Sequence, residues 1–431
     1  MKDIAGSAAH YLGTCERLGR FSGAILLAAG GDIVFSGGFG MADRDHRIPN
    51  QPRTRFRIGS LSKPFTAMAI LQLNARGELD TEQPLSDFVP GFPGGAQISI
   101  RHLLDHSSGI PDIVNEDERC LVRKCRYSTK ELVEICAAMP PLFKPGAASR
   151  YSNSGYIILA HVIETLTGIG YDRYIRDNVF TPLDMSRSGA WNEPGDPPDC
   201  AVGYSIDGSE VIPAEERDPS TVIGCGGLES TVGDLYAWDR ALYTDRLVSR
   251  HLMETMAERS TTGFACGWRA SAMFQRRIVW HDGGIEGFTA GLYRFVDDRA
   301  CVILLSNLEH AWEREISQTL AAILLGQPYS IPEERGVAAI ERSALPDYEG
   351  TYWFSSDFEV SIARKDDRLF FKATRQPRFE IFPAVRDRFF MNSSPAELSF
   401  TRGRMGAVTL LTLHQSGEHL VGKKLGVTSL T

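Results

Sequence analysis

Residues 56–67 read FRIGSLSKPFTA and place Ser60 and Lys63 one helical turn apart. Side chains three positions apart lie on the same face of a helix, so the amine of Lys63 can take the proton of the Ser60 hydroxyl. A Ser-Lys pair in this S-x-x-K spacing is one known variant of the machinery for nucleophilic acyl transfer. The pattern occurs once in the chain, and Ser60 is therefore our candidate nucleophile. The alternative is a serine that only caps a helix N-terminus.

Two further short patterns follow this pair, and each of them also occurs once. Tyr151-Ser152-Asn153 comes first, and His281-Asp282-Gly283 comes later in the chain. The order of S-x-x-K, Y-x-N, and then a basic residue, a variable residue and glycine is that of the serine β-lactamases and penicillin-binding proteins. The sequence between and after these motifs also resembles that of these proteins, at residues 101–111 (RHLLDHSSGIP), 226–231 (GGLEST) and 302–307 (VILLSN). Over roughly residues 15–325 the chain resembles the class C β-lactamase-related serine hydrolases.

The resemblance implies a catalytic role for four side chains. Ser60 would be the acylated nucleophile, and Lys63 would be its base or would hold the proton network. A neutral lysine needs a pKa lowered from about 10.4 to roughly 7–8, at a cost of about 3–5 kcal/mol. If Lys63 stays charged, Tyr151 is the proton acceptor, and Tyr151 would also return the proton to the leaving group. His281 stands where relatives usually carry lysine, and it would polarise this network and titrate near neutrality.

The same resemblance implies contacts with the substrate. Asn153 would orient Lys63 and the acyl side chain of the substrate. The backbone N–H of Gly284, together with that of Ser60, would form the oxyanion hole. Gly283 would let a substrate lie against the strand edge without a side chain in the way. The alternatives are a packed aromatic residue at Tyr151 and an ordinary core histidine at position 281.

Two acidic residues depart from the family pattern. Asp282 stands where hydrolases that recognise a substrate carboxylate have threonine or serine. A carboxylate at that position would repel a carboxylate ligand, which disfavours β-lactams and peptides with a free C-terminus. Glu229 lies within GGLEST, at a position that is often apolar in relatives, and it would receive a substrate amine. The alternative for Glu229 is a solvated glutamate on a loop.

Strand and helix patterns together predict an α+β fold. Apolar runs at 23–28 and 33–35 indicate a hairpin, and strand-like runs recur at residues 277–281, 289–295 and 300–305. Helical periodicity lies between these two groups of strands, so the end strands can share one antiparallel sheet that helices cover. The resemblance implies the β-lactamase/penicillin-binding-protein architecture, an antiparallel sheet flanked by helices with a helical subdomain.

The C-terminal part of the sequence has a different pattern, with short strand-like runs and no helical periodicity. Beyond Leu345, strand-like runs recur about every eight to twelve residues, which is typical of a small antiparallel barrel or sandwich. Residues 345–352 (LPDYEGTY) are similar to the lipocalin-like tail of some hydrolases of this group. We predict a hydrolase domain at 1–328, a linker at 329–342 and a lipocalin-like β-barrel at 343–431. The barrel would roof the active site or join copies of the chain into a homo-oligomer.

Composition limits the partners and the compartment. The chain has 431 residues and a net charge of −8 without long runs of one sign, which argues against nucleic acid or an anionic membrane as the main partner. The N-terminus, MKDIAG, shows no secretory signal. Eight cysteines without C-x-x-C spacing fit free thiols in a reducing, cytoplasmic setting. The histidines form no metal-binding pattern, so we expect neither a metal nor an organic cofactor.

Together these patterns predict a serine hydrolase that works through an acyl-enzyme on Ser60. The candidate substrates are esters of small acyl groups, amides, and D-amino peptides with a free amine. The same residues could transfer the acyl group to an amine or alcohol, or cyclise a peptide, if water were excluded. They would also suit a β-lactamase, or a binding protein that is acylated without turnover.

Overall fold

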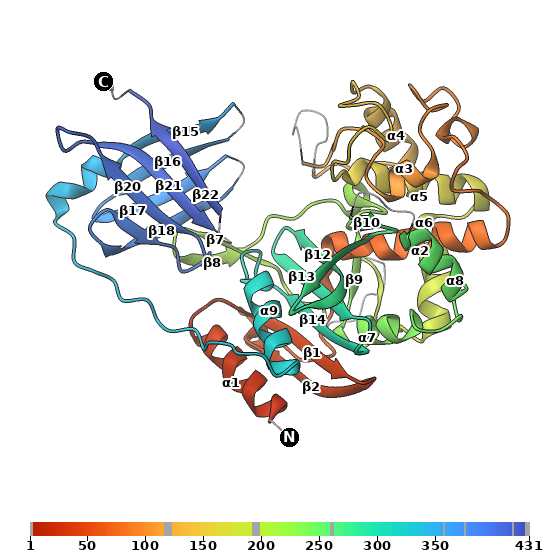
Figure 1. Cartoon of the computed structure of the whole chain (residues 1–431), viewed down its shortest axis with the longest axis horizontal. Helices are drawn as coiled ribbons and strands as arrows, with labels where there is room; N and C mark the ends of the chain where they lie inside the picture. Colours follow the sequence, from red (N-terminus) through yellow and green to blue (C-terminus); the bar gives the residue numbers. More distant parts are fainter. Residues whose placement is uncertain are drawn as a thin grey trace.

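The computed structural model describes residues 3–115, 123–191, 199–258, 263–356, 358–374, 376–415 and 418–426. Hydrophobic cores lie on both faces of one large sheet, and a further core fills a C-terminal barrel. Figure 1 shows this barrel beside the larger part of the molecule, which is built from the sheet and its helices. Residues 327–341 connect the two parts without regular structure.

Within the described residues, the large sheet has seven antiparallel strands in the order β10-β11-β12-β13-β14-β1-β2. The strands are β1 (Gly23–Ala29), β2 (Asp32–Phe39), β10 (Phe264–Ala265), β11 (Trp268–Met273), β12 (Arg276–Ile285), β13 (Phe288–Phe295) and β14 (Ala300–Ser306). Strand β1 pairs with β14, so both ends of the hydrolase part contribute to one sheet, as the sequence predicts. The apolar run of β1 is buried because helices cover both faces of the sheet.

Two groups of helices cover these faces. Helices α1 (Ile4–Arg17) and α9 (Glu313–Leu324) share a core with one face of the sheet. Helices α2 (Lys63–Ala75), α5 (Asn153–Thr167) and α7 (Val232–Ala241) share a core with the other face. The predicted α+β class is therefore confirmed, and the turn that carries Ser60 leads into helix α2.

Local sequence signals determine where several of the other helices begin and end. Helix α4 (Thr129–Ala137) begins with a capping box, in which Ser128 and Glu131 each accept a hydrogen bond from the other's backbone N–H. Helix α5 ends at Gly168, whose φ of 70° is the left-handed conformation of many helix C-caps. The remaining helices are α3 (Ile100–Leu104), α6 (Tyr171–Ile175) and α8 (Arg250–Glu258).

Short strands connect the site to its surroundings. Strands β5 (Phe56–Arg57), β6 (Gly189–Ala190) and β9 (Leu228–Ser230) form a small sheet in the order β5-β9-β6, directly ahead of Ser60. The other short strands are β3 (Met41–Asp43), β4 (Ile48–Pro49), β7 (Tyr204–Asp207) and β8 (Glu210–Pro213). Among the described residues, no helix combines the length and hydropathy that crossing a bilayer requires.

The C-terminal part forms a closed eight-stranded antiparallel barrel, which confirms the predicted architecture. Its strands are β15 (Gly350–Ser355), β16 (Phe358–Lys365), β17 (Arg368–Ala373), β18 (Arg378–Val385), β19 (Arg388–Phe390), β20 (Glu397–Arg402), β21 (Val408–Gln415) and β22 (Glu418–Lys424). Aromatic rings fill its interior, and Tyr348, Phe389 and Phe400 contact one another with ring centroids 4.9–5.4 Å apart.

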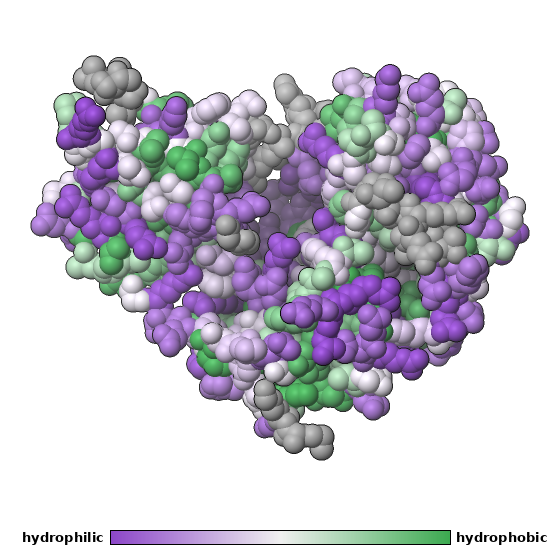
Figure 2. All heavy atoms as spheres, in the orientation of Figure 1, coloured by the Kyte–Doolittle hydropathy of each residue, from purple (hydrophilic) through white to green (hydrophobic). Residues whose placement is uncertain are grey.

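The hairpin of β7 and β8 joins the barrel to the hydrolase part. Asp207 accepts two hydrogen bonds from the Arg378 guanidinium, at 3.1 and 3.2 Å. Next to this pair, Gly208 forms an isolated bridge with Phe379 of β18. The ring of Phe379 meets His310 edge to face at 4.8 Å, close to the N-terminus of α9. In Figure 2 the surface is hollowed between the barrel and the larger part of the molecule.

Candidate active site

Ser60 lies in a 3-10 turn, Gly59–Ser62, that leads directly into helix α2. The free N–H groups and the dipole at a helix N-terminus favour negative charge, which suits an oxyanion formed beside Ser60. Gly59 has a φ of 49°, a left-handed conformation that glycine adopts without strain. A Cβ at Gly59 would lie 2.9 Å from the nitrogen of Gly284, so a glycine is needed where this turn meets strand β12.

Two candidate proton acceptors contact the Ser60 hydroxyl. Lys63 Nζ donates a hydrogen bond to Ser60 Oγ at 3.0 Å, and the Tyr151 hydroxyl donates one at 2.7 Å. Both distances are within the reach of a general base. The structure therefore brings together the three side chains that the sequence patterns single out, from helix α2 and from the segment that precedes α5.

Lys63 is fully buried and its amine is hydrogen-bonded on every side. Besides Ser60 Oγ, its Nζ donates to Asn153 Oδ1 at 2.7 Å and to the carbonyl oxygen of Cys225 at 2.8 Å. Asn153 in turn donates from Nδ2 to Asp112 Oδ2 at 2.9 Å. Three acceptors satisfy the donors of an ammonium group, which makes its burial tolerable. Asn153 therefore contacts Lys63 as the resemblance implies.

Sequence reasoning missed two members of this network. Asp112 directly follows the RHLLDHSSGIP segment, and its place beside that segment is the one signal that could have pointed to it. The carbonyl of Cys225 carries no signal in the sequence, because every residue has a carbonyl and only the fold selects one.

The ring of Tyr151 packs against two aromatic side chains, His106 and Phe264. His106 packs against it at a tilt of 34° with ring centroids 4.5 Å apart, and Phe264 meets His106 edge to face at 4.7 Å. Burial, followed by the charge of Lys63, lowers the pKa of His106 well below its usual value. His106 Nδ1 accepts a hydrogen bond from the backbone N–H of Ser152 at 3.2 Å. A neutral His106 thus holds Tyr151 and Ser152 in place through its ring contact and this hydrogen bond.

His281 lies on β12, 1% exposed, with its ring centroid 6.2 Å from that of Tyr151. Its Nδ1 is 2.5 Å from the carbonyl oxygen of Asp282, which can only accept, so Nδ1 carries the proton. Burial first, and then the charge of Lys63, lower the pKa of His281 to about 4. The expectation that His281 titrates near neutrality is therefore wrong, and the ring that faces Tyr151 is neutral at pH 7.

The reason given for Gly283 is also wrong. A Cβ at Gly283 would lie 2.0 Å from the carbonyl oxygen of Ile58, so this glycine admits the turn that carries Ser60 rather than a substrate. Gly284 differs, because no atom lies within 4 Å of the position its Cβ would take. Gly284 lines the same pocket as Ser60, a position that suits the predicted oxyanion contact of its N–H.

Asp282 does not line the pocket at Ser60. Successive side chains on a strand point to opposite faces, so Asp282 projects away from the face on which buried His281 lies. Its carboxylate is about half exposed and lies 3.9 Å from Arg269 Nε. Asp282 therefore does not form the predicted wall against substrate carboxylates, because strand alternation turns it to the other face.

Glu229 is neither a substrate contact nor a solvated loop residue. It lies on β9, is 4% exposed, and forms an ion pair with the buried guanidinium of Arg55. A carboxylate buried this deeply needs such a partner to offset its desolvation. The prediction that Glu229 receives a substrate amine is therefore wrong, because pairing of β9 with β5 places it beside residues 55–57.

The pocket at Ser60 has a volume of about 380 Å³, within the usual range of small-molecule sites. Ser60, Tyr151, Asn153 and Gly284 line it, and the sequence predicts each of them. Residues that sequence reasoning missed form the rest of its charged and aromatic lining: Arg123, Arg217, Glu286, Phe288, Glu309 and His310.

Of the two carboxylates that line the pocket at Ser60, that of Glu286 is already paired with arginines. Glu286 accepts hydrogen bonds from Arg217 Nε to both of its oxygens at 3.0 Å, and from Arg123 Nη1 at 3.3 Å. Although burial acts to raise it, the pKa of Glu286 is lowered by its hydrogen bonds and charge interaction with Arg217. Glu309 is different, since no ion pair involves it within the described part of the chain. The described residues also contain no cluster of three or more side chains placed to hold a metal ion.

Comparisons with known proteins identify the family. A family model described as Beta-lactamase matches residues 12–326, and one described as Domain of unknown function (DUF3471) matches residues 334–424. Penicillin-binding protein 4* of Bacillus subtilis (strain 168) is 30% identical over 430 residues, which cover 93% of this chain and 94% of that protein. The putative penicillin-binding protein PbpX of the same organism is 34% identical over 67% of this chain and 71% of its own length.

Solved structures share the fold. The octameric penicillin-binding protein homologue from Pyrococcus abyssi aligns with a TM-score of 0.67 and 24% identity over 96% of this chain and 99% of its own. The D-amino acid amidase from Ochrobactrum anthropi SV3 aligns with a TM-score of 0.67 and 21% identity over 75% of this chain and 99% of its own. The chain belongs to the beta-lactamase family of serine hydrolases, as a penicillin-binding-protein homologue that carries a C-terminal eight-stranded barrel.

Proposed function

We propose that this protein hydrolyses ester or amide bonds through an acyl-enzyme on Ser60 and prefers substrates with a free amine. One observation carries the chemistry: Ser60 Oγ lies 3.0 Å from Lys63 Nζ and 2.7 Å from the Tyr151 hydroxyl. A nucleophile in contact with two groups able to move its proton is the arrangement that acyl transfer needs.

The proposed steps use only these groups. The Lys63–Tyr151 pair must first lose one proton, which leaves either a neutral Lys63 amine or a Tyr151 phenolate. That group takes the Ser60 proton as Oγ attacks the carbonyl carbon, and the N–H groups of Ser60 and Gly284 stabilise the oxyanion. Tyr151 then protonates the leaving amine or alcohol. Water enters next, loses a proton to the same network, and attacks the acyl-enzyme to release the acid and restore Ser60.

Hydrolysis is proposed ahead of transfer to another amine because of the exposure of the nucleophile. Ser60 is only partly buried and lines an open pocket, whereas acyl transfer in place of hydrolysis depends on excluding water. The preference for an amine has a separate support in Glu309, the pocket carboxylate without an ion pair among the described residues. The fold shared with a D-amino acid amidase adds to this support.

The chemistry is tested by intact mass and turnover with p-nitrophenyl acetate, D-alanine p-nitroanilide and benzylpenicillin. We expect turnover with the ester or the anilide that Ser60→Ala abolishes. Ser62→Ala is the matched control, because Ser62 is fully buried and its hydroxyl accepts a hydrogen bond from the backbone of Leu228. Full activity of Ser60→Ala would overturn the proposal, and a stable penicilloyl adduct without turnover of any substrate would identify a binding protein.

The preference for an amine is tested separately. D-Alanine p-nitroanilide carries a charged amine, whereas its N-acetyl derivative has a neutral amide and one added acetyl group at the same position. We expect Glu309→Gln to raise KM for the free amine by about fivefold, since a partly exposed ion pair contributes up to about 1 kcal/mol, and to leave the N-acetyl substrate unchanged. Equal effects on both substrates would overturn the role of Glu309 but not that of Ser60.

A further inference from the structure

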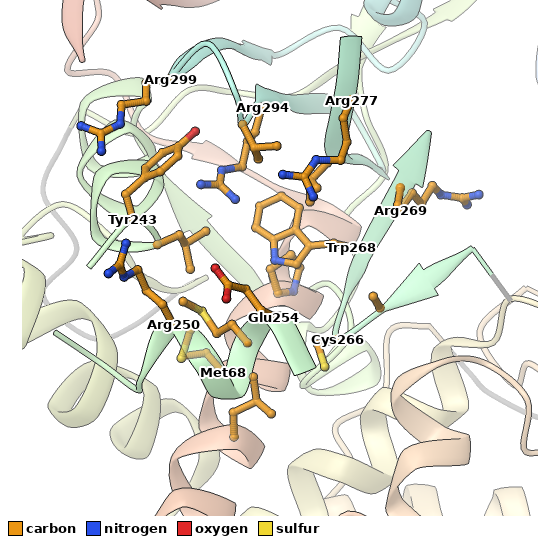
Figure 3. Close-up of a pocket in the computed structure, with 18 residues that line it drawn as sticks. Met68, Tyr243, Arg250, Glu254, Cys266, Trp268, Arg269, Arg277, Arg294 and Arg299 are labelled. Atoms are coloured by element: carbon orange, nitrogen blue, oxygen red, sulfur yellow. The ribbon is translucent and has the colours of Figure 1, made fainter. Parts of the chain in front are cut away.

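A second pocket, also of about 380 Å³, is lined in part by the β10–β11 hairpin and does not include Ser60. Helices α2 and α8 and strands β11, β12 and β13 contribute to its walls. Figure 3 shows it as a chamber with Trp268 near its centre and Tyr243 on one side. Its volume is within the range of small-molecule sites, and nothing in the proposed reaction uses it.

Positive charge dominates the lining of this pocket. Glu254 is the only acidic residue among the residues that line it, all of which are described. The basic residues are the arginines Arg250, Arg269, Arg277, Arg294 and Arg299. In Figure 3 all of these except Arg269, which points away, are arranged around Trp268 and Tyr243. Four arginines from α8 and the β12–β14 region, Arg250, Arg277, Arg294 and Arg299, therefore surround one small cavity.

The acidic partners of these arginines lie outside the pocket lining. Arg294 pairs with Asp239 at 2.6 Å, Arg277 with Asp297 at 3.0 Å, and Arg250 with Asp245 at 3.8 Å. None of these three aspartates lines the cavity. Arg299 forms no ion pair within the described part of the chain. Arg299 therefore presents a guanidinium without an ion pair, while aspartates outside the lining already offset the charges of Arg250, Arg277 and Arg294.

The pocket also presents an unsatisfied hydroxyl. The Tyr243 hydroxyl is buried and finds no hydrogen-bond partner among the described residues. Burial raises the pKa of Tyr243, so the phenol stays protonated and donates. The Arg294 guanidinium lies 4.9 Å from the centre of its ring. A buried donor without an acceptor costs free energy, and an anionic oxygen bound beside Arg294 would satisfy it.

The remaining lining is apolar and includes an aromatic face. Trp268 lies near the centre of the cavity, and Met68, Leu71 and Val279 lie among the residues that line it. Such a surface favours a flat apolar body, while guanidinium groups favour carboxylate or phosphate oxygens. We propose that this pocket binds a small aromatic anion, with its carboxylate or phosphate among Arg250, Arg294 and Arg299 and its ring against Trp268.

The β10–β11 hairpin couples this site to the reaction. Its two-residue turn, Cys266-Gly267, has φ values of 47° and 82°. A Cβ at Gly267 would lie 2.7 Å from the nitrogen of Pro64 and 2.8 Å from the carbonyl of Lys63, so the turn packs directly on the backbone of the candidate catalytic lysine. Cys266 and Trp268 line the second pocket on either side of that contact.

Side chains of the same hairpin reach the Tyr151 ring. Arg269 lies 5.5 Å from the centre of that ring, and Phe264 lies 6.0 Å from it. A ligand that shifts strand β11 would therefore shift the surroundings of both Lys63 and Tyr151. Occupancy of the second pocket is accordingly expected to change the rate of acylation of Ser60.

Calorimetric titration at fixed ionic strength tests the site directly. The probes are benzoate, phenyl phosphate, the neutral isostere benzamide, and inorganic phosphate. We expect benzoate or phenyl phosphate to bind at least about tenfold more tightly than benzamide, because charge-assisted hydrogen bonds are lost in the neutral probe. Equal affinity for benzamide would overturn the anion site, and equal affinity for inorganic phosphate would overturn the aromatic part of the proposal.

Variants assign the binding to this cavity. The double variant Arg250→Gln, Arg299→Gln should weaken binding of the anionic probe by about tenfold or more. Tyr243→Phe, which keeps the ring, should weaken it several-fold. Arg386→Gln is the control, since this arginine is 80% exposed on the barrel. Unchanged affinity in the first two variants, with unchanged melting temperatures, would overturn the site.

A kinetic measurement tests the coupling. Saturating benzoate should change the acylation rate constant for p-nitrophenyl acetate in the parent protein and leave it unchanged in the double variant. The same rate with and without benzoate in the parent protein would overturn the coupling. Because acylation without benzoate tests the proposed function and titration tests the second pocket, the two failures are distinguishable.

Discussion

Asp112 fixes the orientation of Asn153, because its carboxylate accepts a hydrogen bond from Asn153 Nδ2 at 2.9 Å. The amide oxygen of Asn153 is thereby turned toward Lys63 Nζ, which lies 2.7 Å away. Both Asp112 and Asn153 are buried. Without this carboxylate the amide could rotate and present its donor group to a cationic amine, which would repel it.

Replacement of Asp112 by alanine should therefore slow acylation. We expect kcat/KM to fall about 10- to 100-fold, since a hydrogen bond involving a charged group is worth about 1.5–3 kcal/mol. Steady-state kinetics with p-nitrophenyl acetate measures the effect. Asp112→Asn is the control, because it keeps an oxygen that can accept from Asn153. A loss just as large in Asp112→Asn would show that the charge, not the orientation of Asn153, is what matters.

Tyr151→Phe should separate packing from chemistry. The variant keeps the ring that packs against His106 but removes the hydroxyl that lies 2.7 Å from Ser60 Oγ. We expect kcat to fall by about 10²- to 10⁴-fold, the usual contribution of general acid–base catalysis. Thermal unfolding should be nearly unchanged. Near-normal kcat with the phenylalanine would exclude Tyr151 from the proton transfers and leave them to Lys63.

The two neighbouring glycines of β12 should respond differently to alanine. A Cβ at Gly283 would lie 2.0 Å from the carbonyl oxygen of Ile58, whereas a Cβ at Gly284 would meet nothing within 4 Å. Gly283→Ala should therefore lower the free energy of unfolding by about 1–3 kcal/mol and displace Ser60. Gly284→Ala should change it by less than about 0.5 kcal/mol. Urea unfolding of both variants decides this, and equal losses would contradict the packing described for Gly283.

Stability should depend on pH through His281. The unfolded chain binds a proton at this residue near pH 6.5, whereas the folded pKa is lowered to about 4. Between these values the unfolded chain holds more protons, so the free energy of unfolding falls as pH falls from about 6.5 toward 4. His281→Gln should flatten that slope by up to about 1.4 kcal/mol per pH unit.

Urea unfolding at pH 7, 6 and 5 measures this slope. His106 adds to it with the same sign, because burial also lowers its pKa. Part of the slope should therefore persist in His281→Gln. His10→Gln, at an exposed position of α1, is the control and should leave the slope unchanged. An unaltered slope in His281→Gln would mean that the folded protein protonates His281 as readily as the unfolded chain.

A chain that ends at residue 328 should fold without the barrel. The two cores on the faces of the large sheet contain no residue beyond position 331, so truncation removes little from them. The barrel core contains Leu345 to Leu413 and takes in Ile206 of the β7–β8 hairpin at its edge. We expect one cooperative unfolding transition and full turnover of p-nitrophenyl acetate. An insoluble product would place the domain boundary elsewhere.

The sequence was sufficient for strands β1, β2 and β12–β14 of the sheet, for the barrel, and for the grouping of Ser60 with Lys63, Tyr151 and Asn153. Each of these depends on local patterns, such as the buried run of β1 or the spacing of Ser60 and Lys63. It was insufficient for Glu229, whose role is decided by an ion pair with Arg55, a residue that directly precedes β5 and is distant in the sequence. It was also insufficient for Asp282, because a motif gives the order of residues but not the face of the strand on which each one lies.

The contact between Gly59 and Gly284 has a consequence for how such proteins diversify. In the proposed reaction this backbone contact would help to set the spacing of Ser60 and the second N–H donor. The pocket lining that would select a substrate, by contrast, consists of side chains on separate segments, among them Arg123, Glu286 and Glu309. Descendants of this chain can therefore exchange the residues that choose a substrate while they inherit the reaction itself unchanged.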